Sequence, residues 1–326
     1  MRVAICLLCS TCLVIPVKLA AENAPSTSQL PTTVSTLATA AEQGTFEVAA
    51  ANELANAALN EANAQLDKVE DGILSTTNFT HLDITLGSDS FGLDTGTRTK
   101  TEIISTLRLH ETANGFLFNQ ASIVDFDDRT TVNLGFGYRN INNADTVIAG
   151  INGFYDYELD AKHRRTGVGV EYLTSLAEFR FNSYSAQSKT RLYKGINETA
   201  LDGSDYKLTA NLPYFYASDL YYKRATWKDG ASYKTTQKEW GLTAEIIPNV
   251  TMAVARQQTN SGKRSSTASI SYAIPIGGPA PAPREMQDGS WTTHLTPIRD
   301  QLYKPVEREN RIMKKALKLG VVVSGY

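Results

Sequence analysis

From about residue 78 to residue 275, the chain alternates apolar residues with small or polar residues, in segments separated by Gly, Asn, Asp and Ser. In segment 131–138, for example, one face is wholly apolar and the other carries only Thr, Asn and Gly. Successive side chains of a β-strand point to opposite faces, so this period predicts strands with one apolar and one polar face. We expect about twelve strands, at 78–87, 99–109, 115–124, 130–139, 146–157, 164–173, 176–185, 204–213, 219–227, 236–247, 250–258 and 266–275.

Two kinds of fold are built from such strands. A water-soluble β-sandwich also alternates, but its buried face usually carries Val, Ile and Leu at a higher density than is found here. The second face of this chain is often Gly, Thr, Asn, Glu or Arg. That combination is typical of a membrane barrel, whose polar face lines a lumen and whose apolar face meets lipid. We therefore favour an all-β fold, a transmembrane antiparallel barrel of about 12 strands, with the sandwich as the alternative.

The connections between the predicted strands differ in length. The seventh, from Ala186 to Gly203, is the longest, whereas Leu173–Leu176 and Ile247–Asn249 are tight and the third, around Asp125–Asp128, is also short. Outer-membrane barrels have an even number of strands, short periplasmic turns and longer surface loops. The odd-numbered connections are the longer or more polar ones except for the third, so we expect both ends of the barrel sequence to lie in the periplasm.

The N-terminal part predicts targeting and leader segments before the barrel. Residues 1–21 run from a basic residue through an apolar stretch to small residues, the order of a secretory signal peptide. Cys6, Cys9 and Cys12 all lie within it, so removal of the signal would leave a chain without thiol chemistry; a lipid-anchored Cys9 or Cys12 is the alternative. Residues 22–76 predict a periplasmic leader and a short Ala-rich helix that ends near Gly72.

Charge and histidine spacing argue against several classes of function. The 32 Lys and Arg residues are balanced by 34 Asp and Glu residues, without the basic excess of a dedicated nucleic-acid binder. The four histidines are scattered singly, without the spacing of a metal site. No Ser–His pair is evident in the alternating pattern. We therefore expect no catalytic, metal or cofactor residues and no nucleic-acid partner, and we predict that the chain is not an enzyme.

Three motifs occur in order within the alternating region: TVNLGFGYR at Thr131–Arg139, GINGFYD at Gly150–Asp156 and RTGVGVEY at Arg165–Tyr172. In residue types, order and spacing they resemble the β-domain of the intimin and invasin family, the inverse autotransporters. The resemblance covers roughly residues 71–262 and continues more weakly at 303–312. It implies a twelve-stranded outer-membrane barrel with its N-terminus in the periplasm. It also implies a C-terminal segment that threads the lumen and carries an adhesive passenger to the cell surface.

Residues 77–276 would then form the barrel, and residues 277–326 a Pro/Gly linker followed by a lumen-threading segment with a short helix near 298–303. Basic residues of this segment would pair with acids of the lumen; a solvated basic tail is the alternative. The side chains expected to face the lumen are Asn133, Asn152, Asp156, Glu171, Glu178, Arg180 and Glu245, and those expected in the threading segment are Arg308, Asn310 and Arg311.

The longest predicted loop combines cations with a tyrosine, and we expect surface contacts from Lys189, Arg191, Tyr193 and Lys194. Such groups suit lipopolysaccharide phosphates or a host surface, although a solvated loop is the alternative. The sequence stops at Tyr326, where the resemblance places the start of a passenger, so a passenger is not evident here.

The expected function is therefore an outer-membrane translocator or display scaffold that contributes to cell adhesion. The alternative is a diffusion porin, or a structural barrel whose loops bind a partner. The expected partners are outer-membrane lipid and lipopolysaccharide, the barrel-assembly machinery, periplasmic chaperones and a separately encoded passenger or host-surface ligand.

Overall fold

The computed structural model describes residues 79–89, 98–212, 218–230, 232–247, 249–275, 294–318 and 321–325. The predicted signal peptide, the periplasmic leader with its Ala-rich helix and the Pro/Gly linker lie outside the described residues. Within these described ranges, no helix combines the length and apolar character needed to span a bilayer.

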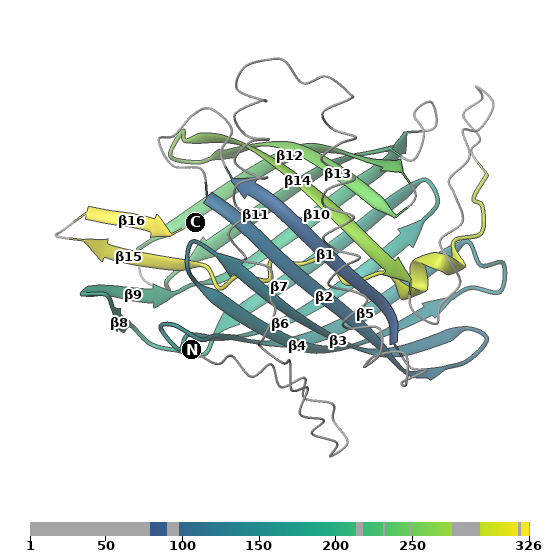
Figure 1. The fold of residues 1–326 in the computed structure, drawn as a ribbon, viewed down its shortest axis with the longest axis horizontal. Coiled ribbons are helices and arrows are strands. Elements are labelled where there is room, and N and C mark those ends of the chain that lie inside the picture. Colours follow the sequence, from purple (N-terminus) through teal and green to yellow (C-terminus); the bar gives the residue numbers. More distant parts are fainter. Residues whose placement is uncertain are drawn as a thin grey trace, which may run out of the picture.

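Twelve strands form one closed antiparallel barrel, as the alternation predicted (Figure 1). Its neighbours follow chain order except that β7 pairs with β10, and β1 closes the barrel against β14. Closure leaves no unpaired edge in the barrel wall. The strands are β1 (Phe79–Asp89), β2 (Arg98–Glu111), β3 (Gly115–Phe126), β4 (Thr130–Ile141), β5 (Val147–Glu158), β6 (Arg164–Thr174), β7 (Ala177–Ala186), β10 (Asp202–Leu212), β11 (Ser218–Lys228), β12 (Lys234–Ile247), β13 (Val250–Thr259) and β14 (Arg264–Pro275).

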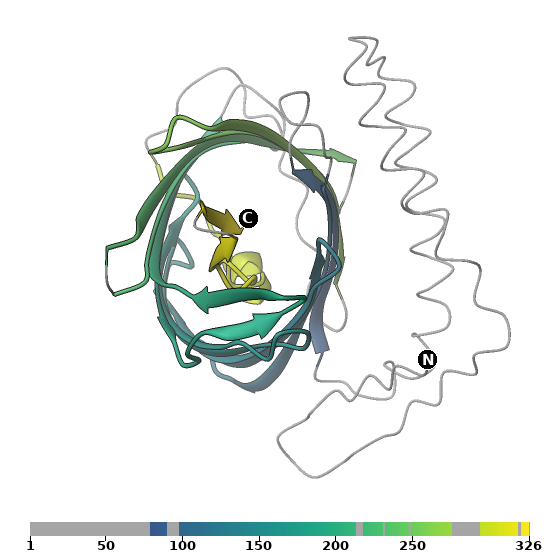
Figure 2. The same cartoon turned by 90° about the vertical axis from the view of Figure 1, so that its left-hand side faces the viewer.

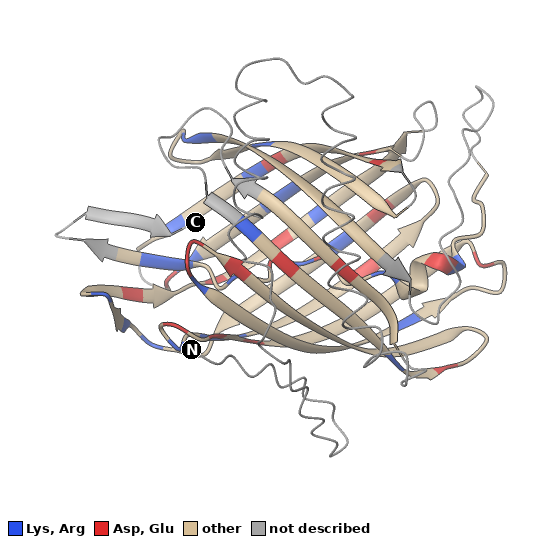
Figure 3. Ribbon diagram, in the orientation of Figure 1, with Lys and Arg blue, Asp and Glu red and all other residues tan. Residues whose placement is uncertain are grey.

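Side chains alternate between a buried interior and an exposed apolar exterior. In β6, Val168 is 64% exposed and Val170 and Tyr172 are also exposed, whereas Arg165 and Glu171 on the other face are buried. A soluble sandwich would bury its apolar face and expose its charges. Acidic and basic residues occur along the barrel strands and not only in the loops (Figure 3). The reversed pattern is that of a barrel whose outer wall meets lipid.

The two ends of the barrel differ in their connections. We call one the turn end, formed by residues 112–114, 142–146, 175–176 and 249, and the other the loop end, formed by 127–129, 159–163, 187–201, 229–230, 232–233 and 260–263. The longest described loop, 187–201, folds into a hairpin of β8 (Arg191–Tyr193) and β9 (Ile196–Ala200).

The segment after the linker lies inside the barrel. Figure 2 shows the yellow helix within the ring of strands, and this element is a 3-10 helix, η1 (Arg299–Tyr303), close to the position where a short helix was expected. The chain then passes through the lumen and leaves at the loop end as β15 (Lys314–Lys318) and β16 (Val321–Gly325). Because β15 pairs with β9, the hairpins join into a four-stranded sheet of order β16-β15-β9-β8. We call residues 299–313 the lumen segment.

Candidate functional site in the barrel lumen

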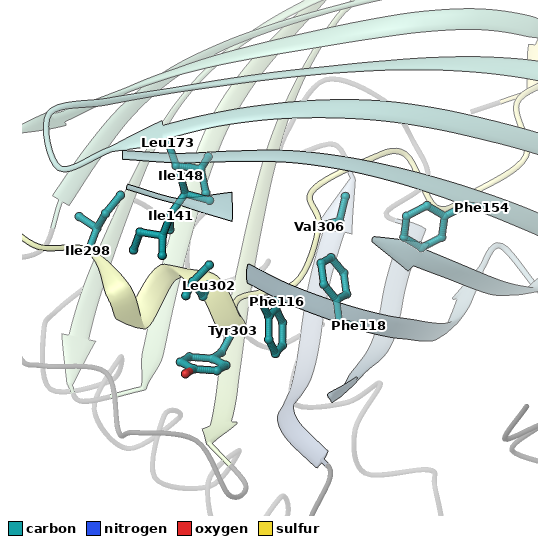
Figure 4. Packing of buried hydrophobic residues seen from close by; sticks show 10 residues of the cluster. All are labelled: Phe116, Phe118, Ile141, Ile148, Phe154, Leu173, Ile298, Leu302, Tyr303 and Val306. Carbon is teal, nitrogen blue, oxygen red and sulfur yellow. The ribbon is translucent and has the colours of Figure 1, made fainter. Parts of the chain in front are cut away.

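The lumen segment begins on an apolar seat at the turn end. Leu302 and Val306 are buried against side chains from β3 to β6 (Figure 4). The ring of Tyr303 meets the Phe116 ring edge-on, with 5.1 Å between centroids. Burying a side chain such as Leu or Val contributes about 1.5–3 kcal/mol relative to leaving it exposed. This seat therefore holds η1 against one wall of the barrel; its remaining members are Phe118, Ile141, Ile148, Phe154, Leu173 and Ile298.

A fully buried arginine binds the C-terminal end of η1. Arg139 on β4 donates from Nη1 to the carbonyl oxygens of Leu302, at 2.8 Å, and of Lys304. Its Nε and Nη2 atoms donate to the two carboxylate oxygens of Glu171, at 2.9 and 3.1 Å. The last carbonyls of a helix lack partners within the helix, so a cationic donor stabilises them there. Glu171 in turn neutralises the buried guanidinium.

Beyond η1, a glutamine side chain forms hydrogen bonds with the backbone of the segment. The amide N–H of Val306 donates to Gln120 Oε1 at 2.7 Å, and Gln120 Nε2 donates to the carbonyl oxygen of Val306 at 3.3 Å. Gln120 is fully buried on β3. This reciprocal pair satisfies both backbone groups of one residue away from water. It therefore fixes where Val306 lies along the barrel axis.

The centre of the lumen holds a carboxylate between two guanidinium groups. Arg308 donates from Nη1 and Nη2 to the two oxygens of Asp156, at 2.9 and 2.7 Å, and Arg165 Nε donates to Asp156 Oδ2 at 2.7 Å. All three side chains are buried. The guanidinium of Arg308 also lies 4.3 Å from the centre of the Phe154 ring. Paired and hydrogen-bonded charges of this kind are strongly held, because separating them would leave a buried charge without a partner.

Neighbouring residues of the lumen segment contact different parts of the wall. Glu307 lies 3.4 Å from Arg180 and 2.5 Å from Lys207. The amide of Glu309 donates to Tyr184 Oη at 2.8 Å, and Asn310 Nδ2 donates to Glu102 Oε1 at 2.5 Å. Residues 306 to 310 therefore each have a separate partner on the barrel wall. Sliding the segment by one residue would break all of these contacts together, so the contacts specify one register.

Ion pairs also mark the two places where the segment meets the barrel ends. At the turn end, Arg299 donates to both oxygens of Asp145, at 2.9 and 2.6 Å, and this bond lowers the pKa of Asp145. At the loop end, Lys314 pairs with Glu158, and Lys315 lies 2.9 Å from Asp229. The lumen segment is thus held at its start and directly after its end.

A buried histidine lies beside the exit at the loop end. His163 is fully buried, and its Nδ1 lies 2.9 Å from Ser188 Oγ. Burial is the main cause that lowers the pKa of His163 to about 4; Glu158 raises it, while Lys314 and Arg129 lower it. The imidazole is therefore neutral at neutral pH. Arg129 bridges Glu158 and Glu198 of β9, so the wall, the loop hairpin and the exiting chain share one network of charges.

The residues expected to face the lumen occur in three settings. Asp156 meets Arg308, and Arg180 joins Glu171, at 3.6 Å, to Glu178 and Glu307. Asn133 is buried and donates to Ser122 Oγ at 2.9 Å, while Asn152 lies beside Gly169. Glu245 lies apart from the lumen segment: its Oε1 accepts from the backbone amide of Asn249 at 2.7 Å, at the turn end. The expected lumen acids thus differ in their partners, since Asp156 binds the lumen segment and Glu245 binds a backbone amide at the turn end.

The residues expected in the threading segment also differ from one another. Arg308 and Asn310 contact the wall, as described above. Arg311 instead pairs with Glu309 of its own segment at 2.9 Å and lies over the Phe126 ring. Lys314 and Lys315 pair with acids at the loop end, Glu158 and Asp229, which were not among the expected partners.

Of the four expected loop contacts, Lys189, Arg191 and Lys194 are exposed. Tyr193 is partly covered, because the guanidinium of Arg129 lies 4.1 Å from its ring centre. Their binding role stays a prediction.

Several residues of the site were not singled out from the sequence, although a signal for them exists. Arg139 and Arg165 lie on the polar face of their strands, together with the glycines of the first and third motifs. Glu307 and Glu309 alternate with Arg308 along an extended segment. Arg139 ends the first motif and Arg165 begins the third, so following the alternation to these motif ends would have identified the two arginines. Gln120 and Tyr184 give no such signal, because their partner is the backbone of a distant segment.

The glycines of the motifs make room for inward side chains. A Cβ at Gly137 would lie 2.2 Å from the Phe118 ring, and a Cβ at Gly135 would lie 2.3 Å from the Phe154 ring. A Cβ at Gly167 would lie 3.2 Å from Arg308 Nη2. Gly167 therefore leaves space for the lumen segment itself, while Gly135 and Gly137 leave space for the aromatic residues on which it rests.

Comparisons with known proteins agree with this architecture. The family model described as "Inverse autotransporter, beta-domain" matches residues 28–310. The chain is 23% identical over 217 residues to "Inverse autotransporter adhesin YeeJ" of Escherichia coli strain K12, covering 63% of this chain and 9% of that protein. It is 29% identical over 107 residues to "Invasin" of Yersinia enterocolitica, covering 32% of this chain and 13% of that protein.

A solved structure from work on the in-meso crystallization of membrane proteins shares the fold, with a TM-score of 0.60 at 18% identity over 73% of this chain and 100% of that chain. The family model covers most of the sequence and the structure is a closed barrel with an apolar outer wall. The resemblance noted in the sequence is thereby confirmed. The chain belongs to the inverse autotransporter β-domain family, and its barrel is a barrel of the bacterial outer membrane.

Proposed function

We propose that this barrel is a translocator and display scaffold that holds its own C-terminal segment across the outer membrane. The observation that carries the proposal is the course of residues 299–313, which cross the lumen in one register and leave it where β15 pairs with β9. A chain fixed in this way has its two ends on opposite sides of the membrane. The proposal includes no catalytic step.

The orientation follows from the connections. Short turns face the periplasm and longer loops face outward in outer-membrane barrels. On this rule the turn end lies in the periplasm together with the N-terminal segment, and the loop end lies at the cell surface. The sheet of β8, β9, β15 and β16 would then be displayed outside the cell.

The proposal extends to adhesion. Two relatives bear the names adhesin and invasin, and the chain spans only 9% and 13% of their lengths, so their whole activity does not transfer directly. A passenger would continue from the end of β16 or would be a separately encoded protein that docks at the displayed sheet. Barrel-assembly machinery and periplasmic chaperones would handle the unfolded barrel, as its exposed apolar wall requires.

Cysteine labelling tests the orientation. The sequence has no cysteine after Cys12, so single cysteines can be introduced without background. Lys189→Cys lies in the loop-end hairpin connection and Ala144→Cys in a turn-end connection, and both positions are exposed. We expect a membrane-impermeant maleimide to label Lys189→Cys in intact cells and Ala144→Cys only after the membrane is disrupted. The opposite pattern would overturn the orientation.

Planar-bilayer conductance tests the threaded lumen. We expect the full chain to give little stable current, and a chain cut after Pro275 to give a large one, because the cut removes the lumen segment. Heat-modifiable migration on gels would check that the shortened chain still forms a barrel. A large stable current from the full chain would instead identify a diffusion porin.

A further inference from the structure

The outer wall of the barrel carries a cluster of cations on three adjacent strands. Arg224 on β11 is the cross-strand neighbour of Lys238 on β12, and Trp240, two residues along β12, is the neighbour of Arg256 on β13. All three cationic side chains are exposed on the face that points away from the lumen. In the described part of the chain, none of the three forms an ion pair with a carboxylate. We call these three residues the outer-wall cation cluster.

The cluster lies next to a row of aromatic residues. The Tyr206 and Tyr222 rings are 6.0 Å apart, and the Tyr222 and Trp240 rings are 5.5 Å apart. The next outward-facing pair along β11 and β12, two residues farther from the loop end than Tyr222 and Trp240, is Leu220 and Leu242. These two residues are exposed cross-strand neighbours, so the wall is apolar there. Aromatic residues mark the boundary between the hydrocarbon core and the headgroups in membrane barrels. The cluster therefore lies at the headgroup level on the loop-end side.

The like charges of the cluster repel one another, and this repulsion favours the binding of an anion. Neighbouring strands lie about 4.8 Å apart, so the side chains of Arg224 and Lys238 extend side by side, and like charges directly opposite each other are destabilising. The β3–β6 wall at the same end differs, because it carries exposed Asp125 as well as exposed Arg164. The cationic excess of β11–β13, which exposed Arg264 on β14 extends, is thus not shared by the β3–β6 wall.

We propose that the outer-wall cation cluster binds the phosphate groups of a phosphorylated glycolipid in the outer leaflet. Guanidinium and ammonium groups form short charge-assisted hydrogen bonds to phosphate, and a guanidinium binds two phosphate oxygens at once. The acyl chains of the lipid would lie along the apolar wall beside Leu220 and Leu242. The site is separate from the lumen. It rests on the proposed function only in that the loop end faces the outer leaflet.

Lipid retention by the purified full chain in detergent tests the site without depending on orientation. Native mass spectrometry would measure the affinity for diphosphoryl lipid A, with a dephosphorylated analogue and inorganic phosphate as parallel probes. We expect Arg224→Gln/Lys238→Gln to weaken diphosphoryl lipid A binding by about tenfold or more. The matched control, Lys162→Gln/Arg164→Gln, removes two exposed cations at the same end and should leave this affinity unchanged.

A second variant separates a binding defect from a folding defect. Arg224→Lys/Lys238→Arg keeps both charges and should retain most of the affinity. Equal weakening by both charge-removing pairs would overturn the proposal, as would undiminished binding by Arg224→Gln/Lys238→Gln. Equal retention of the dephosphorylated analogue would show that acyl chains alone are recognised, and full competition by inorganic phosphate would show a simple anion site. Either result would refute a lipid-phosphate site while leaving the translocator proposal intact.

Discussion

Replacing Arg308 with glutamine should release the lumen segment from the centre of the barrel. The Arg308 side chain is 1% exposed and donates two hydrogen bonds to Asp156, and the Phe154 ring covers its guanidinium. Glutamine is shorter and neutral, so it reproduces neither the paired hydrogen bonds nor the charge. The barrel itself keeps the Arg165–Asp156 pair at 2.7 Å, so we expect the wall to stay folded while the segment loosens.

The magnitude follows from what Asp156 retains. Removing one partner of a buried ion pair usually costs about 3–5 kcal/mol when the remaining charge is left alone. Asp156 is not left alone, so the loss is nearer to that of two charge-assisted hydrogen bonds, about 2–3 kcal/mol. At about 1.4 kcal/mol for each factor of ten, the open lumen should become about 30- to 150-fold more populated.

Single-channel recording in planar bilayers measures this population as the fraction of time in a conducting state. Arg311→Gln is the matched control, because Arg311 is 21% exposed and pairs with Glu309 of the same segment. The ion pair moves with the segment, and the contact of Arg311 with the Phe126 ring of the wall contributes about 0.5–1 kcal/mol, so we expect a change of about 2- to 5-fold only. If Arg308→Gln and Arg311→Gln conducted alike, the Asp156 contact would not be what holds the segment in place.

Two further predictions concern the barrel wall and the loop end. Gly137→Ala should destabilise the barrel by about 1–3 kcal/mol, because its Cβ meets the Phe118 ring, while Gly153→Ala, whose nearest atom is 3.9 Å away, should not; heat-modifiable migration over a temperature series would show whether the two differ. The pKa of His163 falls from its ordinary value of 6.5 to about 4 on folding, so the unfolded chain binds a proton that the folded one does not, and stability should fall as the pH drops from 6.5 to 4. His163→Gln should reduce this fall in the melting temperature measured between pH 7 and pH 4.5, and an equal fall in both proteins would contradict the assignment.

The barrel was predictable because alternation is a local property. The residues of each strand themselves indicate which face meets lipid. In β6, for example, Val168 and Val170 lie on the outer face, and Gly167 and Gly169 lie on the inner face. The strand number, the closure and the polar lumen follow from that alternation of apolar and polar residues. The extra strands β8 and β9 were not expected, because they form within a polar loop and are extended by β15, which lies far away in the sequence.

The contacts of the lumen segment were predictable only in part. Sequence charge suggested that basic residues meet lumen acids, and Arg308 with Asp156 is such a pair. The sequence does not contain the register between the segment and the wall, so it did not assign Arg311, Lys314 and Lys315 to the acids that they meet, which are Glu309, Glu158 and Asp229. The register of the lumen segment depends on hydrogen bonds between its backbone and neutral side chains of the wall, such as Gln120 and Tyr184. Composition carries no information about such pairs.

The shared carboxylate at the centre of the lumen also bears on the order of assembly. Asp156 already has Arg165 on the neighbouring strand, and Glu171 already has Arg139. A closed ring of strands without its threaded chain would therefore carry no lone charge at these two carboxylates. Insertion of the segment adds a second cation to Asp156 and does not have to neutralise it. The ring can thus form first, and the threaded chain can take its place afterwards as a later, reversible step of maturation.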